Sequence, residues 1–476
     1  MRNVYLALSE GNVYRDLIRL GMLRHLLETV PDVRVILLTQ AWAVREVLEE
    51  VGHDRVIVAR HDWYKPGRLQ GRIIQARRRL RRRCLIDSAL RIEASMTPAP
   101  DGVRGLFEKY PPNLVVSTQP LEVWESDLVS YARKHGVPSL GIIKSWDNVL
   151  RRPQARADKI AVWGRANHRE ALEIERYRED EVKEVGACAF DRYFEADAIR
   201  PREELWKAKG LDPSRPIILF GTAGAFSGDW DETFMMDLLL EMTAQSEDLK
   251  DVQFVCRLHP CSRLQYFWPY RDNPRVVLSF GSYVKTLGWC MTRAEVDDMA
   301  SMLCHADLVV TPASTLSIEA PIFDTPTIAT LFSTVRPDLH ARATEAGWLR
   351  MHFAPIVQND WLPLAWNPED LLAMIRKGLA DRSWYRAARR TLVEEYVSFT
   401  DGKSYRRVAN LIDELSRGAA GSRRGSSPRR GSREPVGERQ SELRRDAGSG
   451  AWVEATRGEF EEVHLHPSDG SRCAVP

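Results

Sequence analysis

The sequence lacks any long apolar run. No stretch approaches the ~20 consecutive apolar residues that a membrane-spanning helix needs. The opening residues MRNVYLALSEGNVYRD are typical of a strand followed by a loop and a helix, not of a secretion signal. Cysteine is also scarce: seven scattered cysteines form no Cys-x-x-Cys pair, which argues against a zinc ribbon or a redox dithiol. We therefore expect a cytoplasmic protein that contacts a membrane, if at all, only at its surface.

Neither a strong net charge nor a nucleotide-phosphate fingerprint is present. The net charge of +2 gives no general argument for nucleic-acid binding. The small-residue stretch 221–228 follows a predicted strand, but it matches neither the dinucleotide fingerprint nor the P-loop, so ATP hydrolysis is unsupported. No set of His, Cys, Asp and Glu has the spacing of metal ligands, and we expect no metal site.

What the sequence does contain is a repeated alternation of short apolar runs and amphipathic stretches. The first cycle predicts strands at Val4–Leu8, Val33–Leu38, Arg55–Ala59, Leu114–Ser117, Leu140–Ile143 and Lys159–Trp163, and helices that include Tyr14–Leu27 and Ala43–Val51. The second cycle predicts strands at Ile217–Phe220, Val252–Arg257, Val276–Leu278, Leu308–Thr311 and Thr327–Ala329, with the last helix at Ser404–Leu415. Apolar strands that alternate with helices are typical of parallel sheets covered on both faces.

We therefore predict an α/β protein with two Rossmann-like domains, one over residues 1–198 and the other over residues 199–416. In such open sheets, ligands bind beyond the carboxyl ends of the strands. Residues 417–476 are rich in Gly, Ser, Arg and Pro and have no apolar periodicity. They cannot bury enough surface to offset the entropy cost of ordering, so we predict a disordered tail.

The second predicted domain carries a basic pair at the end of a strand. Arg257 and His259 follow the apolar run Val252–Cys256, where a ligand of an open sheet would bind. A guanidinium suits phosphate oxygens, and an imidazole can donate to phosphate or move a proton. The alternative is structural: Arg257 would pair with a carboxylate, and His259 would end the strand.

Two further stretches of this domain could contact the same ligand. Ser314 and Thr315 begin a predicted helix after a strand, and a helix amino end attracts a diphosphate. Glu319, four residues on, could accept the hydroxyls of a ribose. Gly224 lies among small residues that let the backbone approach a ligand. Capping for Ser314 and a surface position for Glu319 are the structural alternatives.

The first predicted domain has a polar cluster around one aromatic residue. Lys144, Trp146, Asp147 and Asn148 follow a strand. Asp147 could take a proton from an acceptor hydroxyl, and Trp146 could stack on a sugar or base; a turn stabilised by Asp147 and Asn148 is the alternative. Gly11 and Asn12, after the first strand, would face the same side.

One run of arginines contrasts with the low net charge of the whole chain. Residues Arg72–Arg83 (RIIQARRRLRRR) hold seven arginines and are predicted to form one helix. With apolar neighbours such as Trp63 and Ile73, the run favours contact with anionic lipid, which for a cytoplasmic protein means the inner face of the plasma membrane, or with a polyanionic acceptor. We do not expect nucleic-acid binding, because no recognition motif accompanies the run. A solvated helix face remains the plain alternative.

Residues 1–416 resemble transferases of the GT-B type. RLHP at 257–260 is similar to the Arg-x-His-Pro element of the CDP-glycerol glycerophosphotransferases of teichoic-acid and capsule synthesis. ADLVVTPASTLSIEA at 306–320 resembles the segment that holds the donor's phosphates and ribose in that family and in the related UDP-GlcNAc 2-epimerases. DGKSYRRVANLI at 401–412 resembles the same family's terminal pattern, and KSWDN at 144–148 resembles a loop of capsule polysaccharide transferases.

The resemblance implies an acceptor-binding first domain, a donor-binding second domain and a final helix that packs back. We therefore predict an inverting transferase of cell-surface polysaccharide synthesis that moves a glycosyl or glycerophosphoryl group from a nucleotide-activated donor to a glycan or lipid-linked acceptor. Arg257, His259, Ser314 and Thr315 would hold the donor diphosphate, Glu319 the ribose, and Asp147 would be the base, with no metal and no further cofactor. A UDP-sugar 2-epimerase and a non-catalytic GT-B-like scaffold at a membrane are the alternatives.

Overall fold

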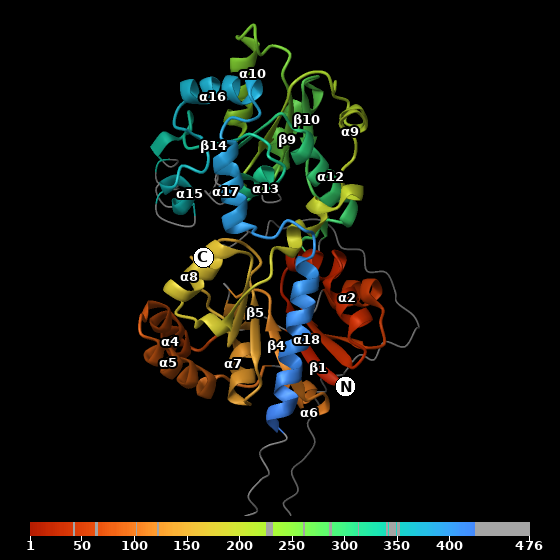
Figure 1. Ribbon diagram of the computed structural model, residues 1–476, viewed down its shortest axis with the longest axis vertical. Coiled ribbons are helices and arrows are strands. Elements are labelled where there is room, and N and C mark those ends of the chain that lie inside the picture. The colour runs from red at the N-terminus through yellow and green to blue at the C-terminus, as the bar shows by residue number, and fades with distance from the viewer. Residues whose placement is uncertain are drawn as a thin grey trace, which may run out of the picture. The chain divides into compact units, whose positions relative to one another are not determined.

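The computed structural model describes residues 1–40, 43–61, 65–100, 102–120, 123–224, 232–259, 262–284, 288–312, 314–338, 341, 349 and 353–423. Residues Met1–Arg423 form one compact unit. Within the described residues, helices and parallel strands alternate along the chain, as Figure 1 shows. The α/β class predicted from the sequence is confirmed.

The first half of the chain forms a parallel sheet in the order β3–β2–β1–β4–β5–β6–β7. Its strands are β1 Arg2–Leu8, β2 Val33–Thr39, β3 Val56–Arg60, β4 Pro112–Ser117, β5 Ser139–Ile142, β6 Lys159–Val162 and β7 Val182–Glu184. The order reverses between β1 and β4, so the crevice in which an open sheet of this kind binds ligands lies at the carboxyl ends of these two strands. The sequence prediction missed β7, a three-residue edge strand whose pattern is too short to recognise.

The second half repeats the arrangement in the order β10–β9–β8–β13–β14–β15. Its strands are β8 Ile217–Gly221, β9 Gln253–Arg257, β10 Val276–Ser279, β13 Leu308–Thr311, β14 Thr327–Thr330 and β15 Leu364–Ala365. A small antiparallel hairpin, β11 Tyr283–Val284 with β12 Gly288–Trp289, stands apart from this sheet. Here the order reverses between β8 and β13, so the two sheets have equivalent switch points.

Helices occupy the connections between strands. In the first half they are α1 Gly11–Tyr14, α2 Met22–Thr29, α3 Val44–Val51, α4 Arg68–Arg79, α5 Arg83–Met96, α6 Val103–Lys109, α7 Ser126–Lys134 and α8 Arg165–Glu173. In the second half they are α9 Arg202–Ala208, α10 Thr233–Ala244, α11 Leu264–Phe267, α12 Arg293–His305, α13 Leu316–Ile322, α15 Ala354–Gln358, α16 Pro368–Ala380 and α17 Arg386–Tyr396.

Two helices that the sequence predicts as continuous are broken. Tyr14–Leu27 is interrupted by a π-helical turn at Arg15–Arg19 and by Gly21, whose φ of 106° no ordinary side chain adopts easily. The arginine run Arg72–Arg83 does not form one helix: α4 ends at Arg79, the backbone is extended at Leu80 and Arg82, and α5 begins at Arg83. Trp63 lies outside the described residues.

The last helix, α18 Ser404–Arg423, returns to the first sheet, where it lies along β1, β4 and α2 (Figure 1). The Arg2 guanidinium donates to the Asp413 carbonyl at 3.0 Å and to Ser416 Oγ at 2.6 Å. The Asp191 carboxylate caps the helix by accepting from the backbone N–H groups of Ser404 and Tyr405 at 2.9 and 2.7 Å. This helix continues past residue 417, so the predicted disordered tail begins too early; residues 424–476 lie outside the described residues.

Candidate active site

Arg257 closes β9 at the carboxyl edge of the second sheet, as the sequence predicts. One terminal nitrogen of its guanidinium, Nη1, donates to Ser279 Oγ at 3.1 Å, and the other, Nη2, lies 3.3 Å from Met291 Sδ. Burial lowers the pKa of Arg257, while the negative charge of nearby Glu319 acts against that shift. An arginine remains a cation under such conditions. Its direct contacts are therefore neutral and weak, and the guanidinium keeps a positive charge that could bind an anion.

His259 lies two residues further on and is fixed through its backbone. Its N–H donates to Thr222 Oγ1 at 2.7 Å, and that hydroxyl also pairs with Ser262 Oγ at 2.8 Å. Burial, assisted by the charge of Arg257, lowers the pKa of His259 to about 4. Near neutral pH the imidazole is uncharged, so it could donate one hydrogen bond to an anion but would not supply a positive charge. Pro260, the last residue of the RLHP motif, lies outside the described residues.

Glu319, on α13, is not the solvent-facing surface residue of the alternative interpretation. Its Oε2 accepts a hydrogen bond of 2.6 Å from the Tyr193 hydroxyl. Burial raises the pKa of Glu319, whereas Tyr193, Arg15 and Arg257 lower it. A carboxylate, a phenol and two guanidinium groups therefore gather here, in a setting typical of functional sites.

Arg15 and Asp16 extend this cluster into the first half of the chain. The Arg15 Nε lies 2.6 Å from Asp16 Oδ1 within the π-helical turn. Burial raises the pKa of the Asp16 carboxyl, and the charges of Arg15 and Lys144 oppose that shift. Asp16 also lines a cavity of about 20 Å³ together with Lys144, Thr118 and Cys188. Such a cavity has room for one water molecule.

The predicted phosphate-binding backbone is partly occupied by the protein's own groups. Ser314 Oγ accepts from the Leu316 N–H at 3.2 Å, as capping would predict, and Thr315 is exposed just before α13. The N–H groups of Ala223 and Gly224 donate to the two oxygens of Glu232 at 2.9 and 3.0 Å. A phosphate would have to displace this carboxylate before it could reach Gly224.

Lys144, which follows β5, reaches Glu10 in the loop after β1 at the switch point of the first sheet. Its Nζ lies 2.5 Å from Glu10 Oε2, and the other oxygen of Glu10 accepts from the Gln119 side chain. Gly11 begins α1, and Asn12 Oδ1 accepts from the Val13 N–H at 2.8 Å. Glu10 and Gln119 follow β1 and β4, so the loops at which the strand order reverses meet through side chains.

The other residues predicted for the acceptor side have structural roles. Trp146 is 2% exposed and packs edge-to-face against Phe353 and Tyr396 at 4.8 and 5.1 Å, so the prediction that its ring stacks on a ligand is wrong. Asn148 is buried, and its Oδ1 accepts from the Lys144 N–H at 3.0 Å. Asp147 accepts from Asn148 Nδ2 at 3.1 Å and from Arg151 Nη1 at 3.3 Å. These contacts match the turn alternative.

The sequence prediction missed Glu10, Arg15, Asp16, Gln119 and Tyr193. Glu10 and Gln119 directly follow strands, and this position was a signal that could have found them. Arg15 and Asp16 were hidden by the prediction of a regular helix. Tyr193 lies in the 3₁₀ segment Cys188–Phe194 that follows the first sheet, where no pattern marks a functional side chain. Among the described residues, no group of His, Cys, Asp and Glu is arranged to hold a metal ion.

Comparison with known proteins identifies the fold of this chain. No family model matches the chain, and no curated protein matches it. Among solved structures, the S. aureus MnaA–UDP co-structure matches with a TM-score of 0.52 and 13% identity over 87% of this chain and 96% of that one. A putative UDP-N-acetylglucosamine 2-epimerase from Listeria monocytogenes matches with a TM-score of 0.52 and 14% identity, over 87% and 97% of the two chains.

The wall teichoic acid polymerase TagF, in a substituted form soaked with CDPG, is also similar: its TM-score is 0.50 and its identity 10%, over 88% and 89% of the two chains. Identities this low carry no residue-level correspondence. They do show a common architecture over almost the full length of each protein. The described part of this chain has the GT-B fold, as the sequence predicted.

Proposed function

We propose that this chain is a transferase that moves a glycosyl or glycerophosphoryl group from a nucleotide-activated donor to a cell-surface polysaccharide or lipid-linked acceptor. One observation carries the proposal. Beside the switch point of the second sheet, the Arg257 guanidinium and the Tyr193–Glu319 hydrogen bond lie close enough for their charges to affect one another. That arrangement pairs a cation for phosphates with a carboxylate for ribose hydroxyls.

In this proposal Arg257 neutralises the charge that grows on the departing nucleotide phosphate, which is the interaction that accelerates such a transfer. His259 donates a hydrogen bond to the same phosphates, and Ser314 and Thr315 offer hydroxyls beside α13. Glu319 exchanges the Tyr193 hydroxyl for the ribose when the donor binds. No metal is needed, because the charge of Arg257 serves in its place.

The acceptor base is better assigned to Glu10 than to Asp147. The carboxylate of Asp147 is held by Asn148 and by an ion pair with Arg151. The Glu10 side chain is 28% exposed and lies at the switch point of the first sheet. Its Oε2 contacts the Nζ of Lys144, and its carboxylate is of the type that serves as a general base.

A thermal-shift screen of CDP-, UDP-, GDP- and CMP-linked donors tests the function, because a ligand that binds the native state alone raises the melting temperature. Arg257→Ala should lower the affinity for the stabilising donor at least ~10-fold in a calorimetric titration, since it removes a charge-assisted contact. Arg390→Ala, an exposed arginine on α17, is the matched control.

The outcomes separate the candidates. Unchanged affinity in Arg257→Ala would overturn the donor site. Conversion of a UDP-sugar in the absence of any acceptor would identify the 2-epimerase that the fold also accommodates. A chain that binds none of the donors would be the scaffold alternative, and the transferase proposal would then fall.

A further inference from the structure

The seven arginines of the run Arg72–Arg83 fall into two groups, one in contact with other parts of the protein and one exposed. Three of its arginines are used inside the protein. Arg77 is buried and its Nε lies 3.0 Å from Glu93 Oε2, a partner that is equally buried. Arg78 donates to the backbone carbonyls of residues 151 and 152 at 2.8 and 3.0 Å. The Arg83 guanidinium donates to both carboxylate oxygens of Glu181, at 2.6 and 2.9 Å.

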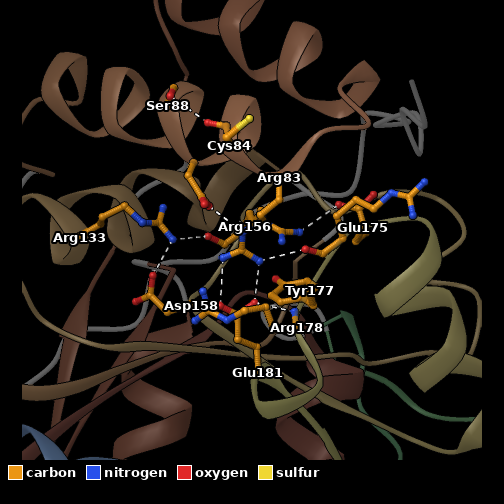
Figure 2. A network of polar contacts seen from close by, with 12 residues as sticks. Arg83, Cys84, Ser88, Arg133, Arg156, Asp158, Glu175, Tyr177, Arg178 and Glu181 are labelled. Carbon is orange, nitrogen blue, oxygen red and sulfur yellow. Dashed lines mark hydrogen bonds and ion pairs between the residues drawn. The ribbon is translucent and has the colours of Figure 1, made fainter.

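These internal arginines hold the start of α5 in place. Figure 2 shows Arg83 in one network with Arg156, Glu175, Tyr177 and Glu181. The Arg156 guanidinium lies 3.8 Å from the centre of the Tyr177 ring and 3.4 Å from Glu175 Oε2. These contacts tie the end of α4 and the start of α5 to the rest of the first half of the chain.

The second group consists of Arg72, Arg79, Arg81 and Arg82. All four are exposed, and none makes an ion pair within the part of the chain that the structure describes. The segment 68–96 holds nine arginines but only two acidic residues, Asp87 and Glu93, while the whole chain has a net charge of +2. Asp87 pairs with Arg83, and Glu93 with Arg77. The segment 68–96 thus carries a local excess of positive charge, with nine arginines against two acidic residues.

The same two helices also expose large apolar side chains. Leu69 on α4 is 62% exposed, and on α5 the exposed fractions are 48% for Leu85, 50% for Ile92 and 37% for Met96. The spacings of seven and four residues place the last three on one face of α5. Ile86 and Leu90, on the opposite face, are buried. We call the surface formed by these four apolar residues and the four exposed arginines the outer face of α4–α5.

We propose that the outer face of α4–α5 docks the protein on an anionic lipid bilayer. Arginines would lie among the charged headgroups, and the apolar side chains would enter the boundary with the acyl chains. No described helix could span a bilayer, so the contact would be at the surface. Nucleic acid fits less well, because its phosphates offer nothing to four exposed apolar side chains, and a second copy of the chain would meet its own positive charge. The proposal is independent of the proposed transferase activity.

The test is co-sedimentation of the full chain with vesicles of phosphatidylcholine alone and of phosphatidylcholine mixed with phosphatidylglycerol. We expect binding only to the mixed vesicles. Arg79→Glu with Arg82→Glu should weaken it more than ~10-fold, because each basic residue near the surface contributes to the attraction. Arg24→Glu with Arg390→Glu reverses the same charge at exposed positions on α2 and α17 and should leave binding unchanged.

Leu85→Ser with Ile92→Ser separates lipid from other polyanions. Both side chains are already exposed, so the fold should tolerate the change, which a melting curve checks. We expect binding to the mixed vesicles to fall ~10-fold or more, with binding to heparin unchanged. If the wild type does not bind the mixed vesicles, or if the serine variant binds them as tightly as the wild type does, the proposal is overturned.

Discussion

His259 is the residue whose chemistry depends most clearly on its surroundings. In the folded chain its pKa is about 4, while an unfolded histidine titrates near 6.5. Between these values the unfolded chain binds a proton that the folded chain does not. The histidine therefore makes the folded state less stable as the pH falls through this window. A bound diphosphate would favour the charged imidazole and reverse this effect locally.

We therefore predict that donor binding takes up a proton at pH values above ~4, because the bound phosphates raise the pKa of His259, and that affinity rises as the pH falls towards ~4. Calorimetric titrations near pH ~5.5 in two buffers with different ionisation heats would measure the uptake. His259→Gln should remove it while leaving the fold intact. Equal heats in the two buffers would contradict the prediction and show that His259 takes up no proton when the donor binds.

Glu10 gives the second residue-scale prediction. Glu10→Gln keeps the size of the side chain but cannot accept the acceptor's proton, so we expect the turnover rate to fall ~100-fold or more with donor affinity unchanged. Asp147→Asn should instead lower the melting temperature, because it weakens the ion pair with Arg151. If Asp147→Asn abolished turnover without changing stability while Glu10→Gln stayed active, the assignment of the base would be reversed.

At the scale of elements, the loop after β4 and the loop after β8 are stabilised in the same way, because backbone N–H groups of each donate to a carboxylate of the protein. After β4, the N–H groups of Thr118 and Gln119 donate to the Glu125 carboxylate at 2.8 and 3.0 Å. After β8, the N–H groups of Ala223 and Gly224 donate to Glu232. In each case the carboxylate comes from the residue next to the following helix. Backbone donors that could hold an anion are thus satisfied internally in this structure.

The pairing of α4 with α5 depends on a buried ion pair. Arg77→Met alone and Glu93→Leu alone should each destabilise the protein by ~3–5 kcal/mol, because each leaves one buried charge without its partner. The double variant should recover most of this loss, since it removes both charges together. Urea unfolding of the three variants measures the coupling. Strictly additive losses would mean that the two side chains act independently.

The elements were largely predictable from the sequence, and parts of the site were not. Buried strands such as β9 are apolar runs of sufficient length, and their ends led directly to Arg257 and His259. Trp146 was misplaced because its burial depends on Phe353 and Tyr396, which no local pattern connects to it. Tyr193 was missed for the same reason: its role arises only when the chain brings it to Glu319.

At the scale of the whole molecule, α18 ties the end of the described chain to its beginning. Val408, Leu411 and Ile412 are buried in the core that also contains strands β1 and β2. A chain that ends at residue 400 should lose on the order of 5 kcal/mol of stability from these three side chains, a large share of what an ordinary domain has. Thermal unfolding and limited proteolysis would detect the loss. A chain ending at Arg423 is the control and should melt as the full chain does.

If the shorter chain melted at the same temperature as the full chain, α18 would contribute nothing to the stability of the first sheet.

The return of α18 also sets an order of events during synthesis. Domains generally fold from the N-terminus as the chain emerges from the ribosome. Here the first sheet is translated early, yet the helix that covers β1 and β4 is among the last described residues to appear. The nascent first half must therefore wait, with part of its apolar surface open, until the second half has left the exit tunnel.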